Sequence, residues 1–242
     1  MHIEVLVEDS SGAVLMGHLM PKLLGEAVSA HTWRIHNYKG IGRIPKKMTP
    51  HTDVAKKTLL DNLPRLLEGY GQTPGYDAVL VLVDTDDRNV AAFRRELKQV
   101  LAQCPNAPQT VFGLATEEIE AWYFGDREAL LEAYPRADKK VLNKYQQDAV
   151  CGTWEMLADA LVKGGATALK KQGFYKAGEF KHECANRIGP LMDVMRNQSP
   201  SFCLTCQGVA DLLAATRARD QLMISCVTPG SEFLDDLKSR PS

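Results

Sequence analysis

The fold of this chain is decided by residues 78–87, which read AVLVLVDTDD. The apolar part has the length of a buried strand, and the carboxylates of Asp84, Asp86 and Asp87 follow it at the edge where open α/β sheets bind ligands. If the strand continues for two residues, Asp84 and Asp86 point the same way, because side chains alternate along a strand. Two carboxylates about 4 Å apart repel by about 4 kcal/mol at an effective dielectric of about 20, and a hard cation between them reverses this. The stretch therefore predicts a Mg²⁺ site.

Strand-length apolar segments recur on both sides of this stretch. We expect strands over residues 2–8, 31–38, 77–84 and 109–115, with helices between them over 13–30, 52–68 and 88–103. A further helix is expected to carry the sequence EEIEAWYFGD. Strands that alternate with helices indicate parallel βαβ units. The sequence thus predicts an α/β fold, a small doubly wound parallel sheet, over residues 1–133.

From about residue 134 onward, short helices broken by Gly and Pro replace the strand pattern. They are expected over residues 153–163, 166–172, 179–188, 190–196 and 206–216. We interpret residues 134–242 as a helical appendage packed on the sheet domain.

Composition limits the function classes. The 242 residues are 45% hydrophobic, which is typical of a globular chain with a core, and the formal net charge is −1. Because there is no basic surplus, an anionic partner would have to meet a local basic patch. No apolar run approaches the roughly 18 residues of a membrane helix, so we expect a soluble, cytoplasmic protein with no membrane partner. The six scattered cysteines are expected to be reduced thiols.

Acidic residues follow three of the predicted strands at matching places. These are Glu8 and Asp9, then Asp84, Asp86 and Asp87, and then Glu117, Glu118 and Glu120. The first and third strands of such sheets are often neighbours, so we expect Glu8 beside Asp84 and Asp86. Simpler roles are open for some of these acids. Asp87 is expected to cap the next helix, and Glu117 and Glu118 to lie in the first turn of a helix, where its dipole favours acids.

The segments VLVEDSSG and LVLVDTDD, in this order, resemble the TOPRIM fold of topoisomerases, primases and OLD-type nucleases. The segments LATEEIEAWYFGD, KKQGFYKAGEF and SPSF extend the resemblance to small stand-alone TOPRIM-like bacterial proteins, often encoded beside an ATPase and with relatives in defence against phage.

The resemblance implies a magnesium-dependent nuclease. Glu8 would match the TOPRIM glutamate, an acid/base or metal ligand, and Asp84 and Asp86 the metal-binding pair, for Mg²⁺ or Mn²⁺. Glu120 would match a further acidic position and Lys176 a lysine that neutralises phosphate charge. Lys176 follows Tyr175 in a basic segment over residues 163–181, a composition typical of a nucleic-acid groove. The resemblance also implies an ATPase partner, and an oligomer is possible.

The chain departs from the nuclease pattern after the first strand. Where nuclease-type members read Glu-Gly-x-x-Glu, this chain reads Glu-Asp-Ser-Ser-Gly over residues 8–12. The alternative interpretation is therefore a non-catalytic TOPRIM-like scaffold that binds an ATPase. A receiver-type signalling domain also gathers acids around Mg²⁺, but the helical half has no place in it.

Overall fold

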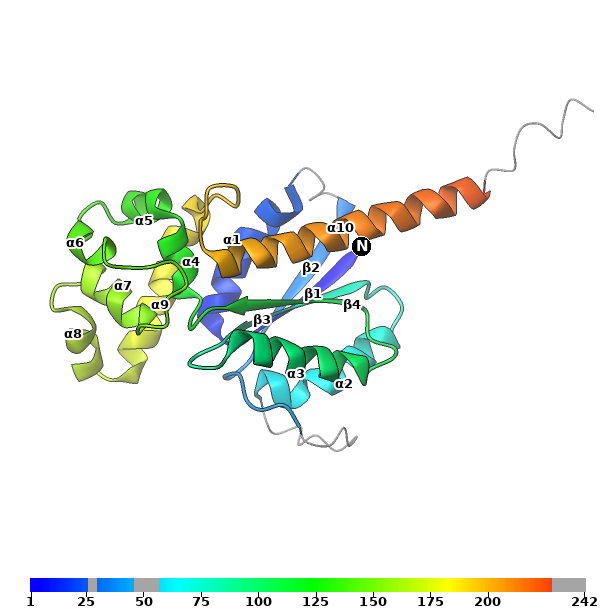
Figure 1. Cartoon of the computed structure of the whole chain (residues 1–242), viewed down its shortest axis with the longest axis horizontal. Coiled ribbons are helices and arrows are strands. Elements are labelled where there is room, and N and C mark those ends of the chain that lie inside the picture. Colours follow the sequence, from blue (N-terminus) through cyan, green and yellow to red (C-terminus); the bar gives the residue numbers. More distant parts are fainter. Residues whose placement is uncertain (26–29, 46–56, 228–242) are drawn as a thin grey trace, which may run out of the picture.

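The computed structural model describes residues 1–25, 30–45 and 57–227, and in this part of the chain the strands form one parallel sheet (Figure 1). Its strands are β1 (His2–Val7), β2 (Thr32–Asn37), β3 (Ala78–Asp84) and β4 (Gln109–Ala115), in the spatial order β2-β1-β3-β4. The first strand lies centrally and the chain winds outward from it in both directions. The predicted small doubly wound α/β fold is confirmed.

Helices cover both faces of the sheet. On one face lie α2 (Leu59–Gly71) and α3 (Val90–Ala102), and on the other α1 (Ser10–Leu24) and α10 (Pro200–Val227) (Figure 1). Beyond the carboxyl ends of the strands lie α4 (Glu120–Gly125), α5 (Arg127–Ala133), α6 (Lys139–Leu142), α7 (Thr153–Leu161), α8 (Gly165–Lys171) and α9 (Phe174–Ile188). The described part of the chain holds no helix that combines the length and apolar character of a membrane span.

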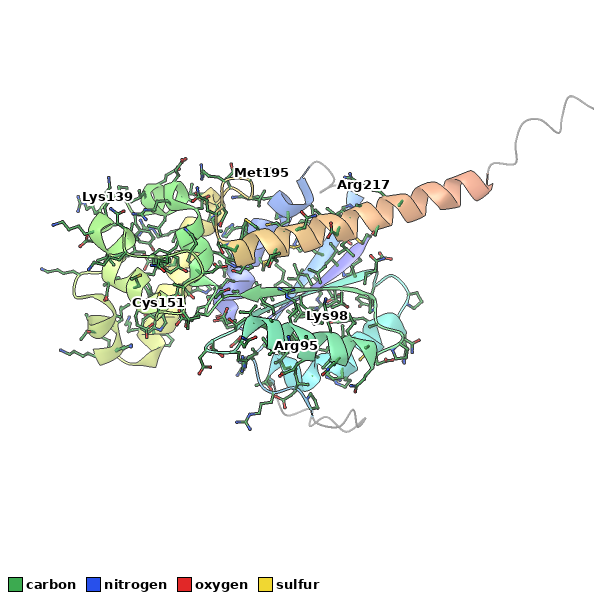
Figure 2. The ribbon with its side chains drawn as sticks, in the orientation of Figure 1. Arg95, Lys98, Lys139, Cys151, Met195 and Arg217 are labelled. Atoms are coloured by element: carbon green, nitrogen blue, oxygen red, sulfur yellow. The ribbon has the colours of Figure 1, made fainter. Side chains whose placement is uncertain are left out.

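The continuous apolar run of β3 follows from its burial on both faces. Val79, Val81 and Val83 pack in the core with α2 and α3, whereas Leu80 and Leu82 pack in the core with α1 and α10. A strand buried on both faces has no polar side, so it reads as an unbroken apolar run. The outer side of α3 is polar, and Arg95 and Lys98 project from it into solvent (Figure 2).

Several predicted helix boundaries were wrong. The helix α1 begins at Ser10 rather than residue 13, because Asp9 caps it: the Gly12 N–H donates to the Asp9 carboxylate over 2.8 Å. The cap of α3 is Asn89 and not Asp87, since the Ala92 N–H donates to Asn89.

The C-terminal helices differ more from the prediction. Helix α9 begins at Phe174, five residues before the expected start, and the helix expected over 190–196 is only a 3₁₀ turn, Gly189–Leu191. Helix α10 starts at Pro200 and runs 28 residues, because proline fits the first turn of a helix, where its missing N–H has no partner to lose. Residues 52–56 of an expected helix lie outside the described residues.

One hydrophobic core joins the two predicted parts of the chain. It contains Val5 and Leu80 of the sheet, Leu157 of α7 and Phe202 of α10, and Trp122 of α4 is fully buried in it. The helical half therefore packs on the sheet. The boundary at residue 133 stays a prediction.

Candidate functional site

The carboxyl ends of β1 and β3 bring Glu8 and Asp84 together. The two strands pair in parallel, and the Asp84 N–H lies 3.4 Å from Glu8 Oε2. The loop after β2 covers Glu8 from the other side, where the Gly40 N–H donates to the Glu8 carbonyl oxygen over 3.1 Å. The predicted neighbourhood of Glu8 and Asp84 is thus present.

The surroundings of Glu8 favour its neutral form. Burial raises the pKa of Glu8 to about 7, and the charges of Asp86 and Asp9 add to the shift, while the N–H groups of Asp84 and Ile41 oppose it. A carboxyl group with this pKa exchanges a proton near neutral pH, as acid/base catalysis requires.

Asp84 lies between two further acids. Desolvation by surrounding protein raises the pKa of Asp84 well above its usual range, and the charges of Glu120 and Glu8 raise it further, against the opposing charge of Lys181. Asp84 therefore experiences the charges of both Glu8 and Glu120, although the three residues lie far apart in the sequence. We call these three residues the acidic cluster.

Glu120, the first residue of α4, is the most deeply buried member of the acidic cluster. Its side chain is 0% exposed, and within the described residues neither carboxylate oxygen has a hydrogen-bond partner. Burial raises the pKa of Glu120 to about 7, while the ammonium of Lys181, 3.6 Å from Glu120 Oε2, lowers it. A buried carboxylate without hydrogen bonds is costly, so this group needs a cation or a proton.

Lys181 of α9 supplies a cation to the acidic cluster. Its Nζ donates to Glu118 Oε1 over 2.9 Å in addition to its contact with Glu120. Burial alone would lower the pKa of Lys181, but the charges of Glu120, Glu118 and Asp84 outweigh it and raise that pKa well above its usual range. Lys181 therefore stays charged at neutral pH.

Lys176, the predicted phosphate ligand, lies elsewhere on α9. Its ammonium is exposed and pairs with Glu179 over 2.6 Å, and no described contact joins it to the acidic cluster. The missed residue is Lys181. Its position could be found from the helix period, because it precedes the apolar residues Cys184, Ala185 and Ile188 by three, four and seven positions and so shares their inner face.

Asp86 does not take the position that a longer strand would give it. The strand β3 ends at Asp84, and Asp86 has a left-handed backbone with φ of 49°, so the alternation that would align the two side chains is broken. Its carboxylate is 55% exposed and accepts from Arg88 over 3.2 Å. Asp86 therefore lies at the rim, where it acts on Glu8 through charge.

Glu117 and Glu118 were expected in the first turn of their own helix. Their carboxylates lie instead at the start of α7. The N–H groups of Cys151, Gly152 and Thr153 donate to the Glu117 carboxylate, and the Trp154 N–H donates to Glu118 over 3.0 Å. The dipole that these acids complement therefore belongs to a helix more than thirty residues away in the sequence.

The donor atoms fit a hard cation, but they are not gathered around one point. Carboxylate oxygens are the ligands that Mg²⁺ prefers, and the two oxygens of Glu120 lack partners. However, no group of three His, Cys, Asp or Glu side chains in the described residues is arranged to hold a metal ion. The nearest cation to Glu120 in this arrangement is Lys181.

Comparison with known proteins gives a family but no activity. The model of the family described as "Domain of unknown function (DUF4276)" matches residues 7–208. Neither the curated proteins nor the solved structures contain a match to this chain. The matched range includes every residue of the acidic cluster and Lys181.

Proposed function

Because the chain belongs to the DUF4276 family, whose description names no activity, we propose its function from the site: a magnesium-dependent phosphodiesterase that cleaves nucleic acid. The observation that carries the proposal is the meeting of Glu8, Asp84 and Glu120 at one sheet edge, with their pKa values raised by burial or mutual repulsion. Such shifts cluster at functional sites. The TOPRIM resemblance points to the same chemistry, and to a cytoplasmic anti-phage effector that works with an ATPase.

The residues that would hold Mg²⁺ are Glu8, Asp84 and Glu120, with Asp86 at the rim. A bound divalent ion neutralises the charge that develops on the phosphate and makes its bound water more acidic. Binding would also compensate the buried Glu120 carboxylate, whose oxygens have no hydrogen-bond partner in the described structure.

The protein's own groups supply the remaining needs of phosphodiester hydrolysis. Glu8, whose pKa is about 7 in the metal-free site, can accept a proton from an attacking water when the ion is held by Asp84 and Glu120 alone. Lys181 keeps its charge at the cluster and would stabilise the anionic transition state. Lys181 therefore takes the phosphate-neutralising role that was predicted from the sequence for Lys176.

The test is a cleavage assay with end-labelled single- and double-stranded DNA and RNA, in Mg²⁺, Mn²⁺ or EDTA. We expect cleavage only with metal, and a loss of at least about 100-fold in Asp84→Asn and Glu120→Gln, a size typical of removing one charge-stabilising group. The matched control is Asp87→Asn, an exposed acid on the same loop, which should cleave as the wild type does. Unchanged cleavage by Asp84→Asn would remove the proposed mechanism.

The second candidate is a non-catalytic scaffold for an ATPase partner. It is favoured by the absence of a three-ligand metal group in the described residues and by Lys181, which already offsets the charge of the acids. Isothermal titration with Mn²⁺ separates the two functions. Tight Mn²⁺ binding that Glu120→Gln abolishes supports the enzyme, whereas no Mn²⁺ binding together with recovery of an ATPase by pull-down supports the scaffold.

A further inference from the structure

A cavity of about 410 Å³ lies among α7, α8 and α9, next to the acidic cluster. It is lined by Trp154, Lys170, Gly173 and Ala177. This volume is in the range of small-molecule pockets, and an aromatic ring with few polar groups is a usual lining for them.

Trp154 connects the cavity to the acidic cluster. Its backbone N–H donates to Glu118 Oε2 over 3.0 Å, and Lys181 Nζ, 2.9 Å from Glu118, lies 6.0 Å from the centre of the indole ring. Lys181 therefore lies between Trp154, which lines the cavity, and the acidic cluster. Only the side chain of Lys181 would separate a ligand stacked on Trp154 from the carboxylates of Glu118 and Glu120.

The lining has the chemistry of a base-stacking site. The Lys170 ammonium lies over the Trp154 ring, 5.3 Å from its centre, where it is exposed and pairs with Glu155. Gly173 has φ of 99°, and a side chain built there would meet nothing within 4 Å, so the chain leaves open space at this wall. An aromatic face bordered by ammonium groups suits a flat ring attached to a phosphate.

We propose that this cavity binds one unstacked nucleobase of a single-stranded nucleic acid, and that the adjoining phosphodiester lies at the acidic cluster. The inference rests on the proposed function of that cluster. A duplex keeps each base stacked between its neighbours, so only a single strand or a flipped-out nucleotide can place a base against Trp154.

The experiment measures binding without cleavage. Protein in EDTA is titrated with an end-labelled oligothymidylate and, separately, with an abasic sugar-phosphate oligomer of the same length. We expect the oligothymidylate to bind more tightly. Trp154→Leu should weaken its binding about 5- to 150-fold, the equivalent of about 1–3 kcal/mol for one stacked base, and Trp154→Phe should retain most of it.

The chain provides a matched control and a second readout. Trp33→Leu changes a tryptophan of β2 and should bind as the wild type does. In a Trp33→Phe protein the remaining tryptophans are Trp154 and the fully buried Trp122, so quenching of fluorescence by the oligothymidylate reports on Trp154 even if Trp154→Leu fails to fold.

Three results would overturn the proposal: no quenching, equal binding of the two oligomers, or thymidine monophosphate binding as tightly as the oligomer, which would assign the cavity to a free nucleotide. Base-dependent binding without metal-dependent cleavage would keep the cavity and reject the phosphodiesterase. Metal-dependent cleavage, together with oligothymidylate binding that Trp154→Leu leaves unchanged, would keep the phosphodiesterase and reject the cavity as a base-binding site.

Discussion

At the scale of single residues, Lys181 and Lys176 show how burial decides what a charge does. Both lie on α9 and both pair with a glutamate, but Lys176 is exposed, whereas Lys181 lies against the buried Glu120. Water screens the first pair and makes it weak. The second cannot be broken without leaving buried carboxylates unpaired.

We therefore expect Lys181→Met to destabilise the protein by about 3 kcal/mol above pH 7, the usual cost of removing one partner of a buried ion pair. The loss should shrink as the pH falls toward 7, because without Lys181 the pKa of Glu120 rises further and the carboxyl takes up a proton. Thermal unfolding across pH measures this. Lys176→Met is the control and should melt as the wild type does. Equal melting temperatures for both variants would contradict the assignment of Lys181 as the counter-ion.

The carboxyl groups of Glu8 and Glu120 predict how metal-free stability depends on pH. Their pKa values rise from 4.5 to about 7 on folding, so between these values the folded state binds more protons than the unfolded state. As far as these groups are concerned, stability should therefore be highest at and below about pH 4.5, and it should fall on the order of 3 kcal/mol per group as the pH rises to about 7.

Denaturant unfolding at a series of pH values in EDTA tests this dependence. Glu120→Gln, which cannot titrate, should give a flatter profile than the wild type. Glu96→Gln, at an exposed position on α3, should leave the profile unchanged. A Glu120→Gln profile as steep as that of the wild type would show that Glu120 ionises in the folded protein as freely as in water.

At the scale of elements, Glu117 joins the end of β4 to the start of α7. Three backbone N–H groups and the Thr153 hydroxyl donate to its carboxylate. Although burial alone would raise the pKa of Glu117, these hydrogen bonds lower it, so the carboxylate stays charged. Glu117 thus does the work of an N-cap for α7 from outside that helix.

Glu117→Gln should destabilise the protein by about 1–2 kcal/mol, as the loss of a helix cap does. Amide hydrogen exchange should accelerate in the first turn of α7 and not in α3. Glu128→Gln, on the exposed α5 surface, should change neither. Unchanged exchange in α7 would mean that the helix start does not depend on this carboxylate.

The elements that the sequence predicted are those whose signal is local. The strand β3 was predicted because burial on both faces leaves a continuous apolar run, and β4 was predicted with both of its bounds. The role of Glu117 was missed, since its hydrogen-bond donors lie more than thirty residues away in the sequence. The start of α10 and the inward position of Lys181 were missed although Pro200 and the helix period are local signals for them. Glu8 and Asp84 were placed together because the order of parallel strands predicts which ends meet.

At the scale of the whole molecule, α10 returns from the helical half to cover β4. Glycines allow this close approach: a side chain on Gly208 would come within 2.7 Å of Val111, and one on Gly113 within 2.9 Å of Thr205. The sheet therefore depends on a helix that begins at residue 200 for part of the cover of the face that α1 also covers.

A fragment of residues 1–133 should consequently fail to fold cooperatively, because it lacks the apolar side chains of α7, α9 and α10 that share the core of the sheet. Circular dichroism during heating would show a broad change where the full chain gives a sharp one. A control fragment of residues 1–227, which lacks only the end of the chain beyond α10, should melt as the full chain does. A sharp transition for the shorter fragment would show that the first 133 residues form an independent domain.

Glu8 and Asp84 of the acidic cluster are translated much earlier than Lys181, their internal counter-ion. Glu8 and Asp84 leave the ribosome first, and Lys181 follows almost a hundred residues after Asp84. Until α9 emerges and docks, a nascent chain carries carboxylates without their internal counter-ion. If the site is a nuclease centre, a cell that makes this protein completes it only after α9 has been translated, a built-in delay between synthesis and activity.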